Sequence, residues 1–313
     1  MMLGVAKDGG RRYSQTVLVA DDSLVVRSGL ADVINASPGM VISGLAASAE
    51  AAIELAGSFR PDIALLDMNM PGGGIEAANG IRVACPQTRL LAFSVRRDKD
   101  AVIAMLRAGA SGYLLKGTRP PRIVSGIVQV LRGRAVLSPE LGRHVTQGLL
   151  VDHEPGSMTA DRPVRVMAVD DDMGVVAAVG ELITGEPGLQ LVGSATNVDD
   201  AIAVAASTHP DVALVDVRMP DWGGERVAFE LSLVSPRTRI LAFSASDDAE
   251  QVVAMLRGGA VGYIVKGFGS QELTSNIRAC AGGHTVLEIG ADALHDLMAW
   301  PRRGPVGGWA AAK

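Results

Sequence analysis

Short apolar runs alternate with segments of helical periodicity along most of the chain. In the first half, runs rich in Val, Ile and Leu have the length of buried strands, at 16–20, 40–45, 63–66, 90–93 and 112–115. Between and after them, apolar residues recur every three or four positions, which predicts helices at 24–35, 48–58, 75–84, 99–108 and 121–131. Near-continuous apolar strands separated by helices are typical of a parallel sheet that is buried on both faces. The pattern predicts an open, doubly wound α/β fold with a five-stranded parallel sheet.

The second half of the chain repeats this pattern. Residues 89–117 align with 239–267 at an offset of 150, with 17 identities in 29 positions, and the upstream motifs align at an offset of 149. One residue has therefore been gained, near the Asp221-Trp222 turn. A period this long indicates a duplicated domain rather than a solenoid repeat. We expect an N-terminal tail (1–14), a first domain (15–133) and a linker with a short helix (134–163). A second domain (164–283) and a C-terminal helix and tail (284–313) follow.

Composition narrows the class of protein. The chain has 313 residues, 48% of them apolar and 20% charged, with no apolar stretch long enough for a bilayer span and no secretory signal. Cys85 and Cys280 are too few for a disulfide framework, which favours a reducing compartment. We therefore expect a soluble, cytoplasmic protein that does not contact membranes. The net charge is −5, aromatic residues make up 4%, and basic residues look scattered, so direct nucleic-acid binding is not expected.

Acidic, hydroxyl and ammonium side chains follow the predicted strands. Asp21 and Asp22 follow the first strand, Asp67 the third, Ser94 the fourth and Lys116 the fifth. The carboxyl ends of parallel strands meet at one edge of a doubly wound sheet, where ligands bind. The second copy, with Asp170, Asp171, Asp216, Ser244 and Lys266, has the same separations. In both copies, 45 residues separate the second member of the acidic pair from the acidic residue at the end of the third strand, and 22 separate the hydroxyl from the ammonium. The sequence predicts one site in each copy.

The residue types indicate phosphoryl chemistry. Three carboxylates in close proximity repel one another and stay ionised when a hard divalent cation, here Mg²⁺, sits among them. Such a cation can hold a phosphoryl group against a carboxylate nucleophile, and we expect Asp67 and Asp216 to be those nucleophiles. Lys116 and Lys266 would neutralise developing charge, and Ser94 and Ser244 would donate a hydrogen bond to a phosphoryl oxygen.

Each copy resembles the receiver domain of two-component response regulators. The shared pattern is an acidic pair after the first strand, an acceptor Asp followed by x-x-Met-Pro, a Ser or Thr after the fourth strand and a Lys after the fifth. The resemblance covers about 15–133 and 164–283, and it is strongest to receivers of the helix-turn-helix class of regulators. No DNA-binding domain follows either copy in this sequence.

The resemblance implies specific roles. Asp67 and Asp216 would accept phosphoryl groups from a histidine kinase or a histidine phosphotransfer protein. Tyr113 and Tyr263 would be the aromatic residues that move inward on phosphorylation, although a half-buried strand tyrosine explains the same positions. Mg²⁺ would be held by the acidic residues of each copy together with a backbone carbonyl two residues after the acceptor: Asp21, Asp22, Asp67 and Asn69 in the first, and Asp170, Asp171, Asp216 and Arg218 in the second.

Two departures from the family pattern affect the expected behaviour. Gly117 and Gly267 follow the two lysines where many receivers have Pro, so a cis-proline at that loop is not available. The residue two after the acceptor is Asn69 in one copy and Arg218 in the other. An amide can orient water, whereas a guanidinium can pair with phosphate. We therefore expect a longer phosphoryl lifetime on Asp216 than on Asp67.

These observations favour a tandem-receiver response regulator that signals through protein contacts with an unidentified output protein. The expected activity is limited to self-phosphorylation and self-dephosphorylation, so the protein is not predicted to be an enzyme. A relay intermediate, a phosphate sink without its own output, and a receiver-like scaffold that is no longer phosphorylated remain alternatives, and homodimer formation is left open. Asp67-x-Asn69 loosely resembles the nucleophile motif of haloacid-dehalogenase-like phosphohydrolases, but Asn69 and Arg218 lack the second carboxylate that those enzymes use.

Overall fold

The computed structural model describes residues 14–146, 162–220, 223–267 and 269–299. The chain forms two compact units, the first made mostly of residues 1–132 and the second mostly of residues 133–313. Each contains one sheet. The predicted turn at Asp221-Trp222 and nearly all of the predicted N-terminal tail lie outside the described residues.

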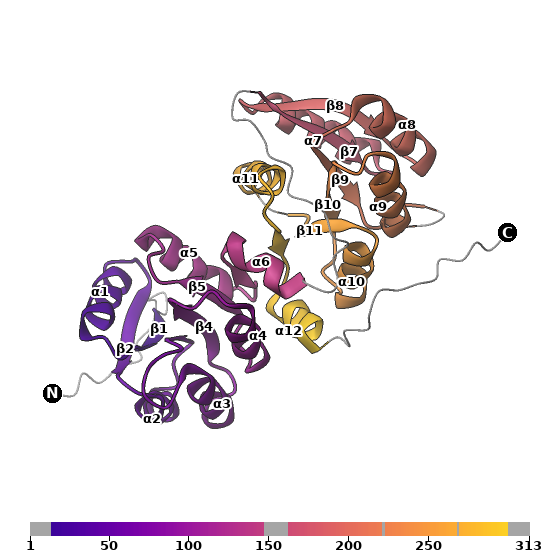
Figure 1. Cartoon of the computed structure of the whole chain (residues 1–313). Helices are drawn as coiled ribbons and strands as arrows, with labels where there is room; N and C mark the ends of the chain where they lie inside the picture. Colours follow the sequence, from indigo (N-terminus) through magenta and orange to yellow (C-terminus); the bar gives the residue numbers. More distant parts are fainter. Residues whose placement is uncertain (1–13, 147–161, 221–222, 268, 300–313) are drawn as a thin grey trace. The chain divides into compact units, whose positions relative to one another are not determined.

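The first sheet is parallel and doubly wound. Its strands occur in the order β2-β1-β3-β4-β5-β6, so the chain reverses direction across the sheet between β1 and β3. Helices α1 and α5 lie on one face and α2 and α3 on the other (Figure 1). The elements are β1 (Gln15–Ala20), α1 (Leu24–Asn35), β2 (Met40–Ala46), α2 (Ala49–Phe59), β3 (Ile63–Leu66), α3 (Gly74–Ala84), β4 (Arg89–Ser94), α4 (Lys99–Arg107), β5 (Gly112–Leu115) and α5 (Pro120–Leu131).

The second sheet repeats the first, in the order β8-β7-β9-β10-β11-β12. Its elements are β7 (Val164–Val169), α7 (Met173–Thr184), β8 (Leu189–Ala195), α8 (Val198–Thr208), β9 (Val212–Asp216), α9 (Gly223–Val234), β10 (Arg239–Ser244), α10 (Ala249–Arg257), β11 (Ala260–Val265) and α11 (Ser270–Ala281). The predicted α/β doubly wound fold is confirmed in both copies.

Each sheet has one strand more than the five predicted. The additional strands are β6 (Val136–Leu137) and β12 (Leu287–Glu288), followed by α6 (Pro139–Thr146) and α12 (Ala291–Ala299). Both lie in segments for which we predicted a helix but no strand, 134–163 and 284–313. A two-residue strand is too short to show an alternating or continuous apolar pattern, so the sequence contains no periodic signal for it.

The central strands are buried on both faces, as a sheet covered by helices requires. Every residue of β3 is at most 1% exposed, and the last four residues of β1 are equally enclosed. Side chains cap the helices that follow: Ser23 accepts a hydrogen bond from the Val26 amide at the start of α1, and Asp172 accepts one from the Gly174 amide at the start of α7. The rigid core therefore fixes where the strands end. None of the helices in the described part of the chain has the length and apolar character needed to cross a bilayer.

Candidate functional site

Three carboxylates meet at the carboxyl edge of each sheet. Asp21, Asp22 and Asp67 each place one carboxylate oxygen within 4.8 Å of the others, and Asp170, Asp171 and Asp216 do the same in the second copy. Asp21 and Asp67 are 1% and 2% exposed, while Asp22 faces solvent. In the first copy these residues directly follow the adjacent strands β1 and β3; in the second, Asp170 and Asp171 follow β7 and Asp216 ends the adjacent strand β9. The predicted acidic clusters are therefore assembled in both copies.

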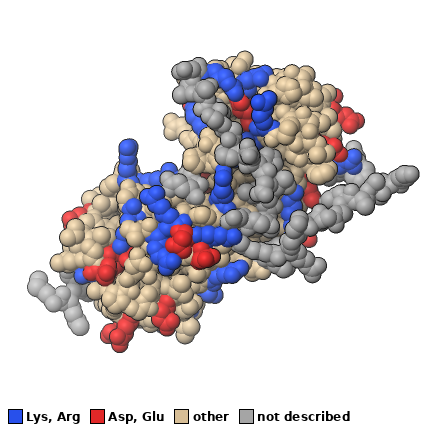
Figure 2. All heavy atoms as spheres, in the orientation of Figure 1, with Lys and Arg blue, Asp and Glu red and all other residues tan. Residues whose placement is uncertain are grey.

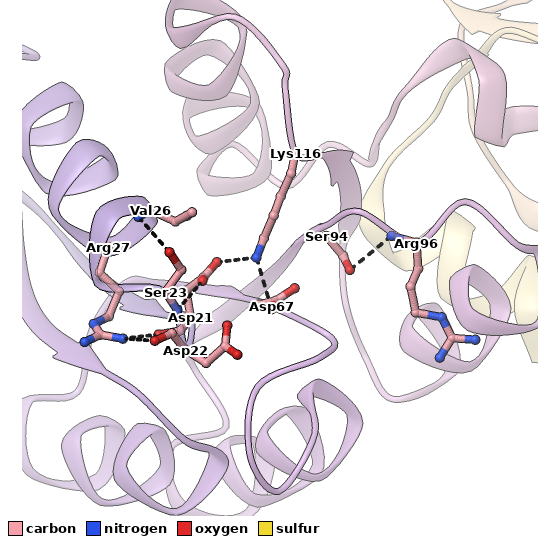
Figure 3. A network of polar contacts seen from close by, with 9 residues as sticks. All are labelled: Asp21, Asp22, Ser23, Val26, Arg27, Asp67, Ser94, Arg96 and Lys116. Atoms are coloured by element: carbon pink, nitrogen blue, oxygen red, sulfur yellow. Dashed lines mark hydrogen bonds and ion pairs between the residues drawn. The ribbon is translucent and has the colours of Figure 1, made fainter.

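The lysine that follows β5 forms ion pairs with two carboxylates of the first cluster (Figure 3). Lys116 Nζ lies 2.7 Å from Asp21 Oδ2 and 3.1 Å from Asp67 Oδ2. Burial by itself disfavours the ammonium, but the hydrogen bonds to Asp21 and Asp67 outweigh that effect and raise the pKa of Lys116 above its usual value. Lys116 therefore stays charged at neutral pH and balances part of the negative charge.

The second cluster has the same geometry. Lys266 Nζ lies 2.6 Å from Asp170 Oδ2 and 2.7 Å from Asp216 Oδ1. Burial again opposes the charge, and the hydrogen bonds to both carboxylates again raise the pKa of Lys266. Lys266 Nζ also lies 5.4 Å from the centre of the Phe243 ring, within the range of a cation–π contact.

Backbone amides hold the acidic residues in place. Asp21 Oδ1 accepts a hydrogen bond from the Ser23 amide at 3.0 Å, and Asp170 Oδ1 accepts one from the Asp172 amide at 3.0 Å. Each turn orients one carboxylate while it begins the next helix. The second acidic residue of each pair stays free to face solvent.

In each copy, the predicted serine and tyrosine form hydrogen bonds with the main chain of the same loop residue. Ser94 and Ser244 are fully buried, and their hydroxyl oxygens accept hydrogen bonds from the amides of Arg96 and Ser246. The Tyr263 hydroxyl donates to the Ser246 carbonyl at 2.7 Å, and the Tyr113 hydroxyl donates to the Arg96 carbonyl at 3.1 Å.

Both tyrosines are fully buried, so neither is the half-buried strand residue that we considered as the alternative. Burial raises the pKa of Tyr263 to about 12. The hydroxyl therefore stays protonated and able to donate to the loop after the buried serine. A role for Tyr113 and Tyr263 as moving switch residues stays a prediction.

The first cluster offers an oxygen that suits a hard cation. Asp67 Oδ1 is buried and has no hydrogen-bond partner within the described part of the chain. A buried carboxylate oxygen without a partner is costly, and Mg²⁺, which prefers carboxylate and carbonyl oxygens, would satisfy it. Asn69 and Arg218 have exposed side chains, and the Arg218 amide donates to Asp216 Oδ2 at 2.7 Å. The donor set fits Mg²⁺.

Sequence reasoning missed several residues at the site. Arg27 bonds the backbone of the acidic pair in the first copy, and Asp172 extends the acidic pair to three residues in the second. The main chain at Gly74 and Gly224 passes so close to Asp67 and Asp216 that an added Cβ would lie 2.6 Å from the Asp67 carbonyl oxygen and closer still to the Asp216 carbonyl oxygen. The glycine that recurs after Asp67 and after Asp216 was a signal for this close approach. The differences in charge at the positions of Arg27 and Asp172 become visible only when the two copies are aligned.

Comparison with known proteins identifies the class. The family model for the response regulator receiver domain matches residues 17–128 and again 166–278. The chain therefore belongs to the response regulator receiver family, with two receiver domains in one chain.

The relatives are response regulators of the NarL type. The nitrate/nitrite response regulator protein NarL of Escherichia coli strain K12 is 38% identical over 127 residues, which cover 40% of this chain and 59% of NarL. The uncharacterized transcriptional regulatory protein YxjL of Bacillus subtilis strain 168 is 40% identical over 121 residues, covering 38% of this chain and 56% of YxjL. The chain thus spans less than two thirds of the length of these relatives.

Solved receiver structures are also similar to part of the chain. A two-component response regulator of the LuxR family from Aurantimonas sp. SI85-9A1 is 32% identical, with 43% of this chain and 96% of that chain covered and a TM-score of 0.41. The signal receiver domain of the putative response regulator NarL from Mycobacterium tuberculosis is 33% identical, with 39% and 98% covered and a TM-score of 0.38.

Proposed function

We propose that the protein is a tandem-receiver response regulator of a two-component phosphorelay, which accepts phosphoryl groups on Asp67 and Asp216 in the presence of Mg²⁺ and signals through protein contacts. The observation that carries this proposal is the buried acceptor carboxylate beside two further carboxylates and a charged lysine, built twice in one chain. That both copies have this arrangement, although their sequences differ at many other positions, is hard to explain by structural needs alone.

The side chains divide the work of phosphoryl transfer. A carboxylate oxygen of Asp67 or Asp216 attacks the phosphorus of the donor, and the bond between phosphorus and the donor's leaving atom breaks. Bound Mg²⁺ would supply charge neutralisation for the phosphoryl oxygens, held by the acidic residues of each cluster. Lys116 and Lys266 stabilise the negative charge, and the Ser94 and Ser244 hydroxyls donate to a phosphoryl oxygen. A histidine kinase or histidine phosphotransfer protein would be the donor.

The proposed readout is a protein contact rather than catalysis on a small substrate. Asn69 and Arg218 supply no second carboxylate for acid–base chemistry, which supports an acceptor over a phosphohydrolase. The two buried free thiols, Cys85 and Cys280, suit the cytoplasm that we propose as the location.

The two receivers present differently charged surfaces to partners. Residues 94–143 contain ten Lys and Arg against three Asp and Glu, whereas the equivalent residues 244–293 contain three against six. Figure 2 shows a group of Lys and Arg, interrupted by a few Asp and Glu, on one unit and further Lys and Arg on the other. The basic residues are therefore less scattered than the overall composition suggested. We propose that the two receivers contact different partner surfaces.

Removal of the cation is the direct test of this function. We expect the full chain, incubated with a small phosphodonor and Mg²⁺, to gain up to two phosphoryl groups by intact-protein mass spectrometry, and hydroxylamine to remove them. A chelator should abolish the incorporation, because the acidic clusters then repel the donor's phosphate. Incorporation that persists without divalent cation, or that resists hydroxylamine, would contradict an aspartyl phosphate formed in these sites.

Phosphoryl lifetimes should differ between the sites. With Asp67→Asn and Asp216→Asn each leaving one acceptor, we expect the group on Asp216 to decay severalfold more slowly, because the Arg218 guanidinium can shield it from water. The exchange of Arg218→Asn and Asn69→Arg should reverse the order. Decay would be followed by mass spectrometry after removal of the donor. Equal lifetimes, or an order unaffected by the exchange, would reject a role for this position.

A further inference from the structure

One arginine distinguishes the first acidic cluster from the second. Arg27 stands on α1, one turn after the capping residue Ser23 (Figure 3). Its Nη1 atom donates to the main-chain carbonyls of both members of the acidic pair, at 2.5 Å to Asp21 and 2.9 Å to Asp22. A permanent positive charge is therefore fixed against the loop that would hold the cation.

The second cluster lacks this arginine and gains an acid. The repeat offset of 149 aligns Val176 with Arg27 and Asp172 with Ser23. Asp172 caps α7, where its Oδ1 accepts from the Gly174 amide at 2.7 Å, so it adds a third consecutive carboxylate beside the cluster. An apolar side chain and a carboxylate replace a guanidinium and a hydroxyl.

Arg218 offsets only part of this difference. Its side chain is exposed, two residues after the acceptor. Counted by formal charge, three Asp with Lys116 and Arg27 leave the first site at −1, whereas four Asp with Lys266 and Arg218 leave the second at −2. The second site is the more negative even with Arg218 included.

We propose that Arg27 weakens divalent-cation binding at the first site and that Asp172 strengthens it at the second, so that the second site fills first as the Mg²⁺ concentration rises. The inference rests on the proposed function, because it takes both clusters to be Mg²⁺ sites. Since phosphoryl transfer depends on the cation, the two receivers would respond over different ranges of Mg²⁺.

Coulomb's law sets the scale of the effect. For a divalent ion at roughly 8 Å from one unit charge, a water-like dielectric gives a factor of about five in affinity. Added salt should reduce the difference between the sites, because these positions are partly open to solvent. The competing possibility is that Arg27 organises the Asp21-Asp22 carbonyls for the cation, in which case its removal would weaken binding.

The test measures Mg²⁺ binding to the full chain by isothermal titration calorimetry, one site at a time. In the Asp171→Asn/Asp216→Asn background, which reports the first site, Arg27→Gln keeps a hydrogen-bond donor and removes the charge. We expect it to tighten binding about fivefold. Arg27→Lys keeps the charge and should bind like the parent. Arg60→Gln removes an exposed charge at the end of α2, on the opposite edge of the sheet, and should also leave binding unchanged.

The second site is reported by the Asp22→Asn/Asp67→Asn background. There Asp172→Ser and Val176→Arg should each weaken binding, and their circular dichroism should match that of the parent. Affinity at the first site that is unchanged or lowered in Arg27→Gln would overturn the inference and leave the proposed function standing. Absence of Mg²⁺ binding by the unaltered chain would overturn both.

Discussion

Asp67→Asn and Asp216→Asn are expected to remove one phosphoryl group each from the chain treated with a small phosphodonor, and the double variant is expected to remove both. Asparagine keeps the shape of the side chain and replaces the nucleophilic carboxylate oxygen with an amide. The effect should be all or none at each site, because the amide that replaces the carboxylate cannot attack the donor's phosphorus. Intact-protein mass spectrometry of the four proteins measures it.

The matched control is Asp62→Asn, which removes a carboxylate at the opposite edge of the first sheet. Asp62 accepts hydrogen bonds from the Thr16 amide and hydroxyl and directly precedes β3, whereas Asp67 directly follows it. Its loss should leave incorporation intact. Two phosphoryl groups on the double variant would show that the acceptors have been assigned to the wrong residues. Loss of both groups in a single variant would show instead that one site depends on the other.

The second large effect concerns Gly74 and Gly224, whose main chain lies against Asp67 and Asp216. Gly224→Ala should lower the free energy of unfolding by about 2–4 kcal/mol, because its new Cβ would have to displace the backbone of the acceptor strand's end. Gly74→Ala should lower the free energy of unfolding by less. Its new Cβ would lie 2.6 Å from the Asp67 carbonyl oxygen, whereas the Cβ of Gly224→Ala would lie closer than that to the Asp216 carbonyl oxygen. Denaturant unfolding measures both, and the Asp-to-Asn variants should not show this loss.

Gly29→Ala is the matched control for the glycine series. Gly29 lies within α1 and an added Cβ would meet nothing within 4 Å, so alanine should stabilise the helix by roughly 0.5–1 kcal/mol. Opposite signs for Gly29 and Gly224 would tie the cost to close approach. A stabilising Gly224→Ala would mean that the loop after the acceptor yields without strain.

Much of the fold could be read from the sequence because each apolar run carried its own signal. The predicted helix at 24–35 and the predicted strands at 63–66 and 112–115 have the observed bounds, and each of the other elements predicted for the first copy differs by one residue at one or both ends. Because the second copy repeats the pattern of the first, each element was predicted from two segments of the chain. The acidic residues could be placed for a simple reason: strand ends in a parallel sheet share an edge, so position along the chain fixed the neighbours.

The rest depended on geometry that the sequence does not record. The strands that contain Val136 and Leu287 are too short to show a pattern in the sequence. The hydrogen bonds from Arg27 to two main-chain carbonyls depend on the conformation of the turn before α1, which the sequence pattern does not give. Tyr113 and Tyr263 illustrate the same limit, because their complete burial follows from packing around β5 and β11 rather than from their place near the lysines.

The short sixth strands bear on how two sheets of the same topology fold correctly in one chain. Duplicated domains risk misfolded states in which strands of one copy pair with the edge of the other. In each described sheet, one edge is a strand of only two residues, too short to template a partner, and the opposite edge strand, β2 or β8, pairs with a register shift that interrupts a flat ladder. Lengthening β6 or β12 would therefore endanger the chain during folding more than it would strengthen either native sheet.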